Sequence, residues 1–142
     1  MRSLWSLSRG TQLDLEFKAR LVAELRHGGR KQGKGHLQRV RADGTAEWCC
    51  VGVACDIIDP NFWEPENTIS DRHSGVKQWH GDTHYMPTWA ALEVGWTHED
   101  VRRLAILNDG YEDDTDLFPD GVPDGGRPHT FDEIADYIEE NY

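Results

Sequence analysis

One apolar stretch near the middle of the sequence constrains the fold more than any other. It runs from Trp48 to Ile58, contains all three cysteines of the chain and is its longest apolar run. Four of its residues recur at the i, i+3, i+4, i+7 spacing of one helix face: Cys50, Val53, Ala54 and Ile57. The run ends before Pro60, because the residue preceding a proline avoids the helical region. The pattern predicts a central, buried helix.

A glycine inside this run predicts close packing. Gly52 lowers the helix propensity of the stretch by about 1 kcal/mol relative to alanine. A glycine is nevertheless favoured where another stretch of backbone lies too close for a side chain. We therefore expect a neighbouring segment to contact the predicted helix at Gly52.

The charge of the chain is divided unevenly along its length. The 142 residues carry a net charge of −11, yet residues 1–50 hold ten lysines and arginines against five acidic residues. Residues 91–142 hold three basic residues against fifteen acidic ones. Phosphate contacts need clustered positive charge, so this composition excludes a general nucleic-acid binder. A surface this acidic keeps a protein in solution, faces a basic partner or mimics a phosphate backbone.

The length and the cysteine content indicate a single domain in a reducing environment. A chain of 142 residues is large enough to bury a core as one domain. No segment reaches the roughly 20 apolar residues that a transmembrane helix needs, and residues 1–10 lack the apolar run of a signal peptide. Three cysteines, two of them adjacent, make a poor disulfide framework. We expect a cytoplasmic protein that makes no membrane contact.

A helix is predicted over residues 11–27. Thr11 is placed as its N-cap, and Asp14, three residues later, completes a capping box. The apolar residues recur at steps of four: Leu13, Phe17, Leu21 and Leu25. Gly28 and Gly29 provide the stop signal of this helix.

A β-hairpin is predicted after this helix. Residues 30–35 form a loop by composition, and two strand-like runs follow, over 36–40 and 45–49. The pair Asp43-Gly44 between the runs is a strong turn signal.

The second half of the chain is predicted to be helical with irregular connections. Residues 60–86 lack a regular pattern, apart from a candidate short strand over 76–79. Three helices are expected from their start and stop signals: one over 89–94 before Gly95, one capped by Thr97 and Asp100, and one capped by Thr130 and Glu133. Residues 111–129, rich in acidic residues, glycine and proline, are predicted to be an exposed loop insertion.

Four short motifs resemble those of a known group of proteins. They are Gln32–Gly35, Trp48–Asp56, Leu107–Asp109 and Thr130–Glu139, in this order. Together they resemble a family of small uncharacterised proteins of tailed bacteriophages, especially those of actinobacteria, with the pattern K-Q-G-x-G, C-C-L-G-V-x-C-D, L-N-D and T/S-F-x-E-I-A-D-x-I-E. The resemblance covers residues from about 17 to 140 and implies a phage origin without implying an activity.

The sequence departs from the resembling group in two places. The acidic loop over residues 111–129 replaces what is usually a short turn, and the leader over residues 1–16 is longer than is typical. The resemblance implies that these two segments are where this member would have acquired a partner of its own.

The cysteines suggest two kinds of chemistry, which we weigh against simple burial. Cys50 and Cys55 lie at the edge of the zinc-ligand spacing, with His73, His80 and His84 as further candidate ligands. A nucleophilic cysteine would need a paired histidine in an exposed, electropositive setting. The apolar neighbours favour buried structural thiols. We therefore assign no metal ligand, no catalytic residue and no cofactor.

The basic, glycine-rich loop is a candidate ligand site. Its cations and backbone N–H groups are suited to a phosphate, although it lacks the Walker pattern. The candidate ligand-binding residues are Arg30, Lys31, Gln32, Lys34, His36, Asn108 and Asp109. The alternative is a solvated turn whose glycines let the chain reverse, with Asn108 and Asp109 ending a helix.

Residues 12–17 are similar to the peptide that docks on the bacterial sliding clamp. Gln12, Leu13, Leu15 and Phe17 follow its pattern Q-L-[SD]-L-F, with one residue inserted before the aromatic. A docking peptide must be extended and accessible, whereas the helical periodicity places Leu13 and Phe17 in a packed core. The helix is the favoured interpretation.

These features predict a compact, mainly helical α+β domain over residues 11–142, preceded by an N-terminal extension over residues 1–10. The expected function is that of a phage-encoded, non-catalytic protein that binds a host protein, in the host cytoplasm, through its acidic C-terminal half. The candidate contact residues are Glu112, Asp113, Asp114 and Asp116, together with Gln12, Leu13, Leu15 and Phe17. The alternatives are a phosphate or nucleotide ligand held by the 30–36 loop, in a binding protein or a small enzyme, and a sliding-clamp binder.

Overall fold

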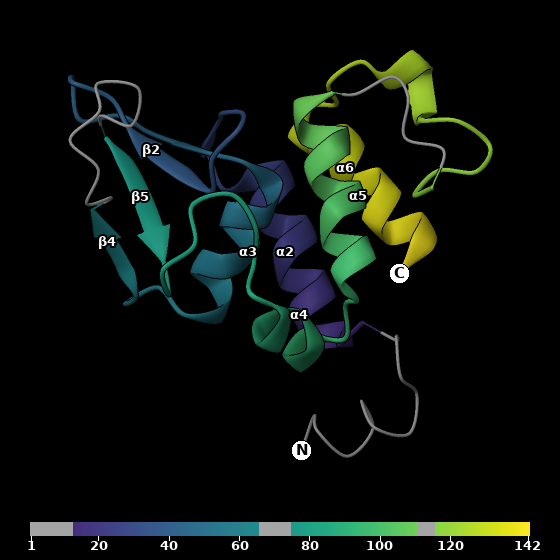
Figure 1. Ribbon diagram of the computed structural model, residues 1–142, viewed down its shortest axis with the longest axis horizontal. Coiled ribbons are helices and arrows are strands. Elements are labelled where there is room, and N and C mark those ends of the chain that lie inside the picture. Colours follow the sequence, from purple (N-terminus) through teal and green to yellow (C-terminus); the bar gives the residue numbers. More distant parts are fainter. Residues whose placement is uncertain (1–12, 66–74, 111–115) are drawn as a thin grey trace.

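The computed structural model describes residues 13–65, 75–110 and 116–142, which form a small sheet packed beside a group of helices (Figure 1). The helices are α2 (Leu15–His27), α3 (Cys50–Ile58), α4 (Thr88–Val94), α5 (His98–Asp109) and α6 (Phe131–Asn141), with a short 3-10 turn, η2, at Pro123–Gly126. The strands are β1 (Lys31–Gln32), β2 (Gln38–Val40), β3 (Ala46–Trp48), β4 (Trp63–Pro65) and β5 (Val76–Trp79). This α+β architecture, mainly helical, is the predicted one.

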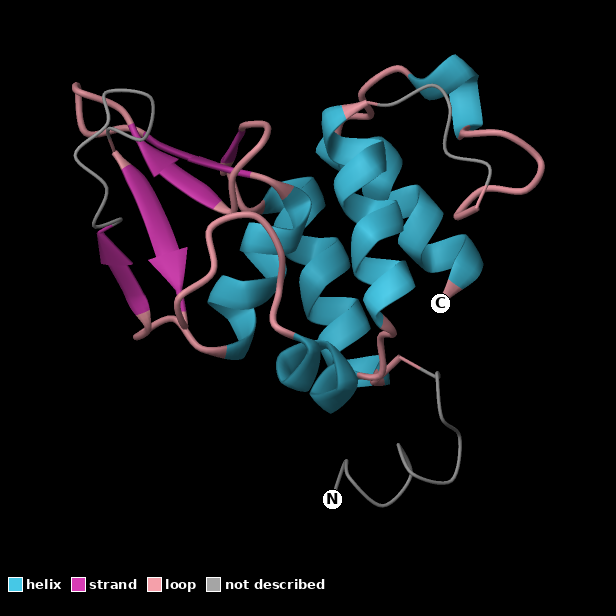
Figure 2. Ribbon diagram, in the orientation of Figure 1, coloured by secondary structure: helices cyan, strands magenta, loops and turns pink. Residues whose placement is uncertain are grey.

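The described strands make one sheet in the order β1-β3-β2-β5-β4. Figure 2 shows the strands together on one side of the helices. The predicted hairpin is confirmed, because β2 and β3 pair in antiparallel fashion. The candidate strand β5 is confirmed too, with β2 and β4 on its two sides. Strands β1 and β4 were not predicted. Each has at most three residues and pairs with a strand more than ten residues away in sequence. No local sequence pattern therefore indicates it.

The first helix begins later than the sequence signals indicate. Asp14 itself is the N-cap, and its carboxylate accepts a hydrogen bond from the backbone N–H of Phe17 at 2.9 Å. The predicted capping box placed Asp14 inside the helix, which is wrong; a short acidic side chain caps an N-terminus directly. The predicted cap Thr11 lies outside the described residues, as does the predicted extension over residues 1–10. The other end is as predicted, since Gly28 follows the last helical residue.

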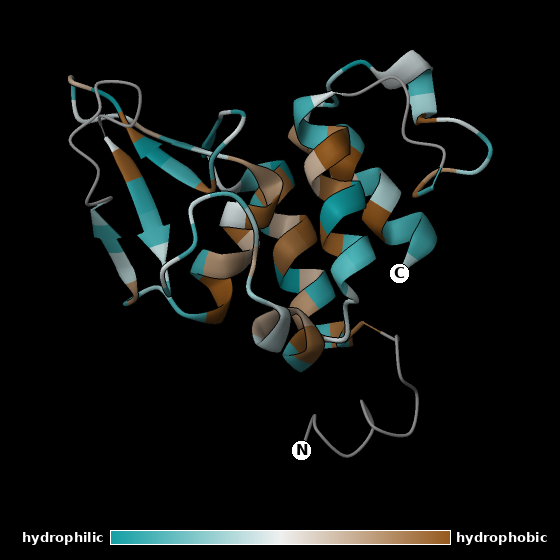
Figure 3. Cartoon of the chain, viewed as in Figure 1, coloured by the Kyte–Doolittle hydropathy of each residue, from teal (hydrophilic) through white to brown (hydrophobic). Residues whose placement is uncertain are grey.

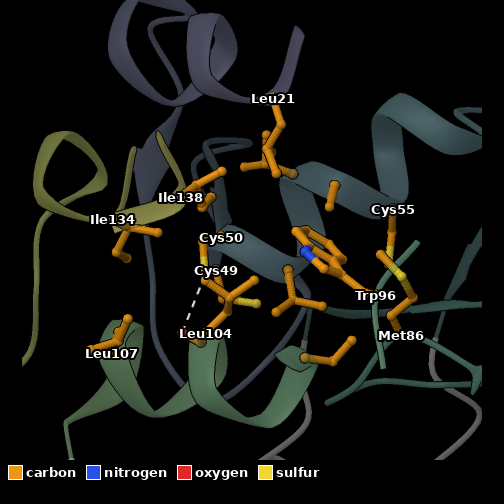
Figure 4. Close-up of a cluster of buried hydrophobic side chains, with 14 of the residues drawn as sticks. Leu21, Cys49, Cys50, Cys55, Met86, Trp96, Leu104, Leu107, Ile134 and Ile138 are labelled. Carbon is orange, nitrogen blue, oxygen red and sulfur yellow. Dashed lines mark hydrogen bonds between the residues drawn. The ribbon is translucent and has the colours of Figure 1, made fainter. Parts of the chain in front are cut away.

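Helix α3 lies at the centre of the core, as predicted. Gly52 sits against the segment before β2, and a Cβ atom placed on it would lie 1.8 Å from the carbonyl oxygen of Leu37. The close backbone approach expected from this glycine is therefore confirmed. Figure 4 shows Cys49, the N-cap of α3, and Cys50, its first residue, among core side chains from α2, α5 and α6, which include Leu21, Leu104 and Ile138.

The two C-terminal helices begin as their sequence signals predict. Thr97 and Asp100 form a capping box at the start of α5, and Thr130 and Glu133 form another at the start of α6. Figure 3 shows hydrophobic and hydrophilic positions following one another along both helices, as expected for elements with one buried face. No helix in the described part of the chain combines the length and the apolar character that crossing a membrane requires.

The segment between α5 and α6 is less exposed than predicted. Within its described residues, 116–129, three apolar side chains are buried: Leu117, Phe118 and Val122. Arg103 of α5 donates to the carbonyl oxygen of Leu117 at 2.8 Å, which ties the segment to the helix. The prediction of an exposed loop was wrong for these three side chains, because glycine, proline and acidic neighbours outweighed them in the composition, whereas the acidic residues Asp116, Asp120 and Asp124 are exposed as predicted.

Candidate functional site

The four sequence motifs meet in one buried network of hydrogen bonds, which we call the polar junction. The side chain of Gln32, in β1, donates to Asn108 Oδ1 at 2.9 Å and to the carbonyl oxygen of His129 at 2.8 Å. Its own oxygen accepts from the backbone N–H of Phe131 at 3.0 Å. One amide side chain thus joins β1 to the ends of α5 and α6.

Asn108 is the most enclosed member of the polar junction, with no exposed surface. Its Oδ1 also accepts from the backbone N–H of Cys50 at 3.1 Å, and its Nδ2 donates to the carbonyl oxygen of Gly33 at 2.8 Å. Asp109 continues the network, because its carboxylate accepts from the backbone N–H of Gly35 at 3.1 Å. A buried amide pays a desolvation cost unless its donors and acceptors are paired, and here they are paired within the chain.

The predicted ligand-binding residues therefore divide into two groups. The donors and acceptors of the Gln32 and Asn108 side chains form hydrogen bonds within the chain. Arg30 is also held within the chain, since it pairs with Glu24 at 3.2 Å and with Asp56 at 2.8 Å and lies over the ring of Trp48. The outward group contains Lys34, which is exposed, and His36, which is partly exposed.

The outward group lines a small hollow on the sheet, which we call the basic pocket. Its volume is about 300 Å³, and it is lined by Gln32, Gly33, Lys34, His36, Arg39, Arg41 and Glu47. Arg41 donates through Nε to the carboxylate of Glu47, and the Lys31 ammonium lies 3.8 Å from the same carboxylate. The ring of His84 packs against that of His36, with centroids 5.2 Å apart. Cations therefore outnumber acidic groups in and beside the basic pocket.

The three cysteines are buried in the core rather than gathered at a reactive surface (Figure 4). Burial raises the pKa of Cys49 to about 12 and raises the pKa values of Cys50 and Cys55 well above the ordinary thiol value. The Cys50 thiol donates to the carbonyl oxygen of Leu104 at 3.3 Å. Protonated, enclosed thiols are poor nucleophiles.

The candidate metal ligands do not assemble around the cysteines in the described part of the chain. No group of three or more histidine, cysteine, aspartate or glutamate side chains suited to a metal ion occurs there. His84 lies beside the basic pocket, His80 lies in an aromatic cluster, and His73 falls outside the described residues.

A second hollow, which we call the acidic groove, is lined by residues of α2, α3 and α4. It has a volume of about 630 Å³ and is lined by Asp14, Glu16, Phe17, Arg20, Ile57, Ile58, Asp59, Trp89 and Glu93. Four carboxylates and one guanidinium therefore surround an apolar floor, and Trp89 is 53% exposed. A single exposed aromatic is unremarkable, but one beside a hollow with carboxylates is a recognition feature.

Trp89 is held in place by a cluster of aromatic rings. It stacks on the buried Trp79 with ring centroids 5.9 Å apart, and it meets the His80 ring edge-on at 5.0 Å. Phe62 stacks on His80 at 4.1 Å, and the His80 ring lies 3.3 Å from the Asp59 carboxylate. Sequence reasoning missed this cluster because its members come from three separate segments.

A local signal for the cluster exists in α4. Trp89 and Leu92 are three residues apart and exposed, whereas Ala90, Ala91 and Val94 face the core. A short helix that carries large apolar residues on its outer face is the pattern that would have pointed to this surface.

The predicted clamp-binding residues lie mostly in the core. Leu13 and Phe17 are buried, and only Leu15 is exposed. Gln12 lies outside the described residues. An extended docking conformation would require the first turn of α2 to leave the core, so this arrangement does not favour the clamp hypothesis.

The predicted acidic contact residues are only partly described. Glu112, Asp113 and Asp114 lie outside the described residues, and Asp116 is exposed. Acidic residues of α6 are partly engaged within the chain, because Arg26 of α2 pairs with Asp136 and with Glu139, each at 2.7 Å.

Comparison with known proteins places the chain in a family without placing it in a functional class. No curated protein and no solved structure matches it. A family model described as a domain of unknown function, DUF8296, matches residues 13–142, which is nearly the whole length of the described fold and includes all four motifs. The chain therefore belongs to the DUF8296 family.

Proposed function

We propose that this protein is a phage-encoded, non-catalytic binding protein that engages a basic segment of a host protein in the host cytoplasm. The observation that carries the proposal is the acidic groove, in which the exposed Trp89 stands beside carboxylates over an apolar floor. The resemblance of the four motifs to phage proteins supports the phage origin.

The acidic groove suits lysine and arginine side chains in particular. Their aliphatic stems pack on apolar surface, and a guanidinium or ammonium group is attracted to the face of a tryptophan ring. The carboxylates of Glu16, Asp59 and Glu93 line the same hollow and are suited to the charged ends. An apolar centre with a charged rim is the usual anatomy of a protein-binding surface.

The acidic C-terminal half contributes long-range attraction in this proposal. Residues 91–142 hold fifteen acidic residues against three basic ones, and the described part includes the exposed Asp116. A surface of one sign speeds the approach of a partner of opposite sign, and salt weakens the effect. Contacts in the acidic groove would then supply the short-range specificity.

The test is binding of basic and acidic peptides to the full chain. We expect tryptophan fluorescence to report saturable binding of an arginine- and leucine-containing peptide, and no binding of its glutamate counterpart. Trp89→Ala should weaken binding about thirtyfold or more, because an anchoring aromatic contributes about 2 kcal/mol or more. Tyr85→Ala is the matched control, since Tyr85 is 44% exposed and does not line the acidic groove.

Binding that persists in Trp89→Ala, or that does not change with ionic strength, would contradict the proposal. The clamp alternative is tested in the same format with purified host sliding clamp. We expect no clamp binding by the folded chain, because Leu13 and Phe17 are buried. Clamp binding that is lost in Leu15→Ala with an unchanged melting temperature would favour the alternative instead.

A further inference from the structure

We propose that the basic pocket is a binding site for a phosphate-bearing small molecule of the nucleotide class. The pocket belongs to a different part of the molecule from the acidic groove, since it is formed by β2, β3 and the β1–β2 loop. The inference is therefore independent of the function proposed for that groove.

The strand register concentrates cations around one carboxylate. Glu47 of β3 has Lys31 as its partner in β1 and Arg39 as its partner in β2. Residues that are partners in a sheet project from the same face. Arg41 reaches the same carboxylate through Nε. Glu47 thus pairs with Lys31 and Arg41, and Arg39 lies on the same face of the sheet, so cations outnumber this carboxylate.

The geometry of Arg41 leaves it suited to a second anion. Its hydrogen bond to Glu47 is made through Nε, and the two terminal nitrogens of the guanidinium carry further N–H donors. Arginine binds phosphate through parallel pairs of N–H donors, and lysine contributes a point charge. Lys34, exposed on the pocket wall, supplies such a charge.

The polar junction makes the pocket a prepared site. The β1–β2 loop is held from below, because Asn108 Nδ2 donates to the carbonyl oxygen of Gly33 and Asp109 accepts from the N–H of Gly35. Lys34 lies between these two anchored glycines. A loop fixed before binding loses little conformational entropy on binding, and affinity rises accordingly.

The size and the surroundings favour a small ligand over a nucleic acid. A volume of about 300 Å³ is at the lower end of the range for ligand pockets. A long polyanion would also approach a chain with a net charge of −11, which repels it beyond the immediate pocket. A compact phosphate group is attracted by the cations of the pocket and is small enough to avoid most of the repulsion from the rest of the chain.

The experiment is a titration of the full chain with pyrophosphate and with adenosine monophosphate, followed by amide NMR shifts at constant ionic strength. We expect saturable shifts centred on Gly33, Lys34 and Gly35. Lys34→Ala should weaken pyrophosphate binding about tenfold, the usual effect of losing one charged hydrogen bond. Arg102→Ala is the matched control, because it removes an exposed cation of α5 outside the pocket and should leave binding unchanged.

Three results would overturn the proposal. They are the absence of saturable shifts at millimolar pyrophosphate, an equal loss of affinity in the Lys34→Ala and Arg102→Ala variants, and tighter binding of a single-stranded oligonucleotide than of pyrophosphate. Arg41→Lys adds a check that does not depend on net charge. It should weaken binding because lysine lacks the paired donors, and the dispersion of its amide spectrum reports whether the variant is folded.

Discussion

The segment from Arg30 to Arg41 has an inward and an outward side that differ in their contacts. On the inward side, the partly buried Gln32 forms hydrogen bonds to the ends of α5 and α6, and the buried Leu37 lies against Gly52 of α3. On the outward side, Lys34 and Arg41 are exposed around the basic pocket. The composition of the segment is uniformly basic and glycine-rich, so composition does not separate the two sides.

The two sides of this segment indicate that different side chains of one loop serve stability and recognition. An enclosed amide must be paired, and removing its partner leaves buried groups without hydrogen bonds. An exposed lysine contributes little to the folded state, because water and salt screen its charge. Substitutions on the inward side should therefore unfold the protein, and those on the outward side should change only what it binds.

The largest effect is expected at Gly52, where α3 touches this segment. Gly52→Ala should lower the free energy of unfolding by about 4 kcal/mol or more, because the new Cβ would lie 1.8 Å from a backbone oxygen of Leu37. Gly33→Ala is the comparison: its Cβ would lie 2.9 Å from Glu47 Cβ, which is a milder overlap than the one at Gly52, so a smaller loss is expected. Urea unfolding measures both. Equal losses would contradict the close approach at α3.

A large effect is also expected at the polar junction. Asn108→Ala should cost about 3–5 kcal/mol of unfolding free energy, because it leaves several buried groups unpaired, including the N–H of Cys50 and the carbonyl of Gly33. Asn141→Ala, at the exposed end of α6, should cost less than about 1 kcal/mol. Thermal denaturation distinguishes them. A mild Asn108→Ala variant would mean that the motifs meet for ligand binding rather than for folding.

A small effect is expected on the outward side. Lys31→Ala should change the unfolding free energy by less than about 0.5 kcal/mol, since its ammonium lies 3.8 Å from Glu47 and is mostly exposed. The measurement is chemical denaturation at low and at high salt. A loss similar to that of Asn108→Ala would remove the distinction between the two sides of the segment.

The smallest effect, expected at an exposed ion pair, provides a pH-dependent reference. Hydrogen bonds from Arg127 and from the backbone of Thr130 lower the pKa of Glu133 from 4.5 to about 2. The lowered value means that the charged form stabilises the fold above pH 4.5 and that this contribution is lost as the pH falls toward 2. The Glu133→Gln variant should therefore have a slightly lower melting temperature than the parent protein at pH 7, and the same melting temperature near pH 2. A difference that grows on acidification would contradict this assignment.

Much of the helical structure was predictable because its signals are local. The capping pairs Thr97 with Asp100 and Thr130 with Glu133 act within one turn, and the apolar run of α3 indicated a buried helix, which is enclosed on all sides from Cys50 to Cys55. Strand β1 was not predictable in this way, since its two residues gain their structure only by pairing with β3.

The candidate sites were predictable only in part. The basic loop was predicted to be a candidate ligand site from its composition, and that prediction included Gln32 and Asn108, whose side chains form hydrogen bonds within the chain. The acidic groove was not recognised, because Trp89, Asp59 and Phe17 come from three separate helices and their caps. Proximity between distant segments has no signature in a single sequence.

The sequence by itself determined the central helix, the close approach at Gly52, the caps of the C-terminal helices and the uneven charge. The central helix and the caps depend on neighbours within about one or two helical turns, where residue spacing and backbone preference act directly. The glycine indicated a close approach but did not identify Leu37 as the residue that makes it. Only the tertiary structure decided which polar residues face inward. The direction of Gln32 follows from the packing of β1 against α5 and α6, and the same packing leaves Lys34 at the surface.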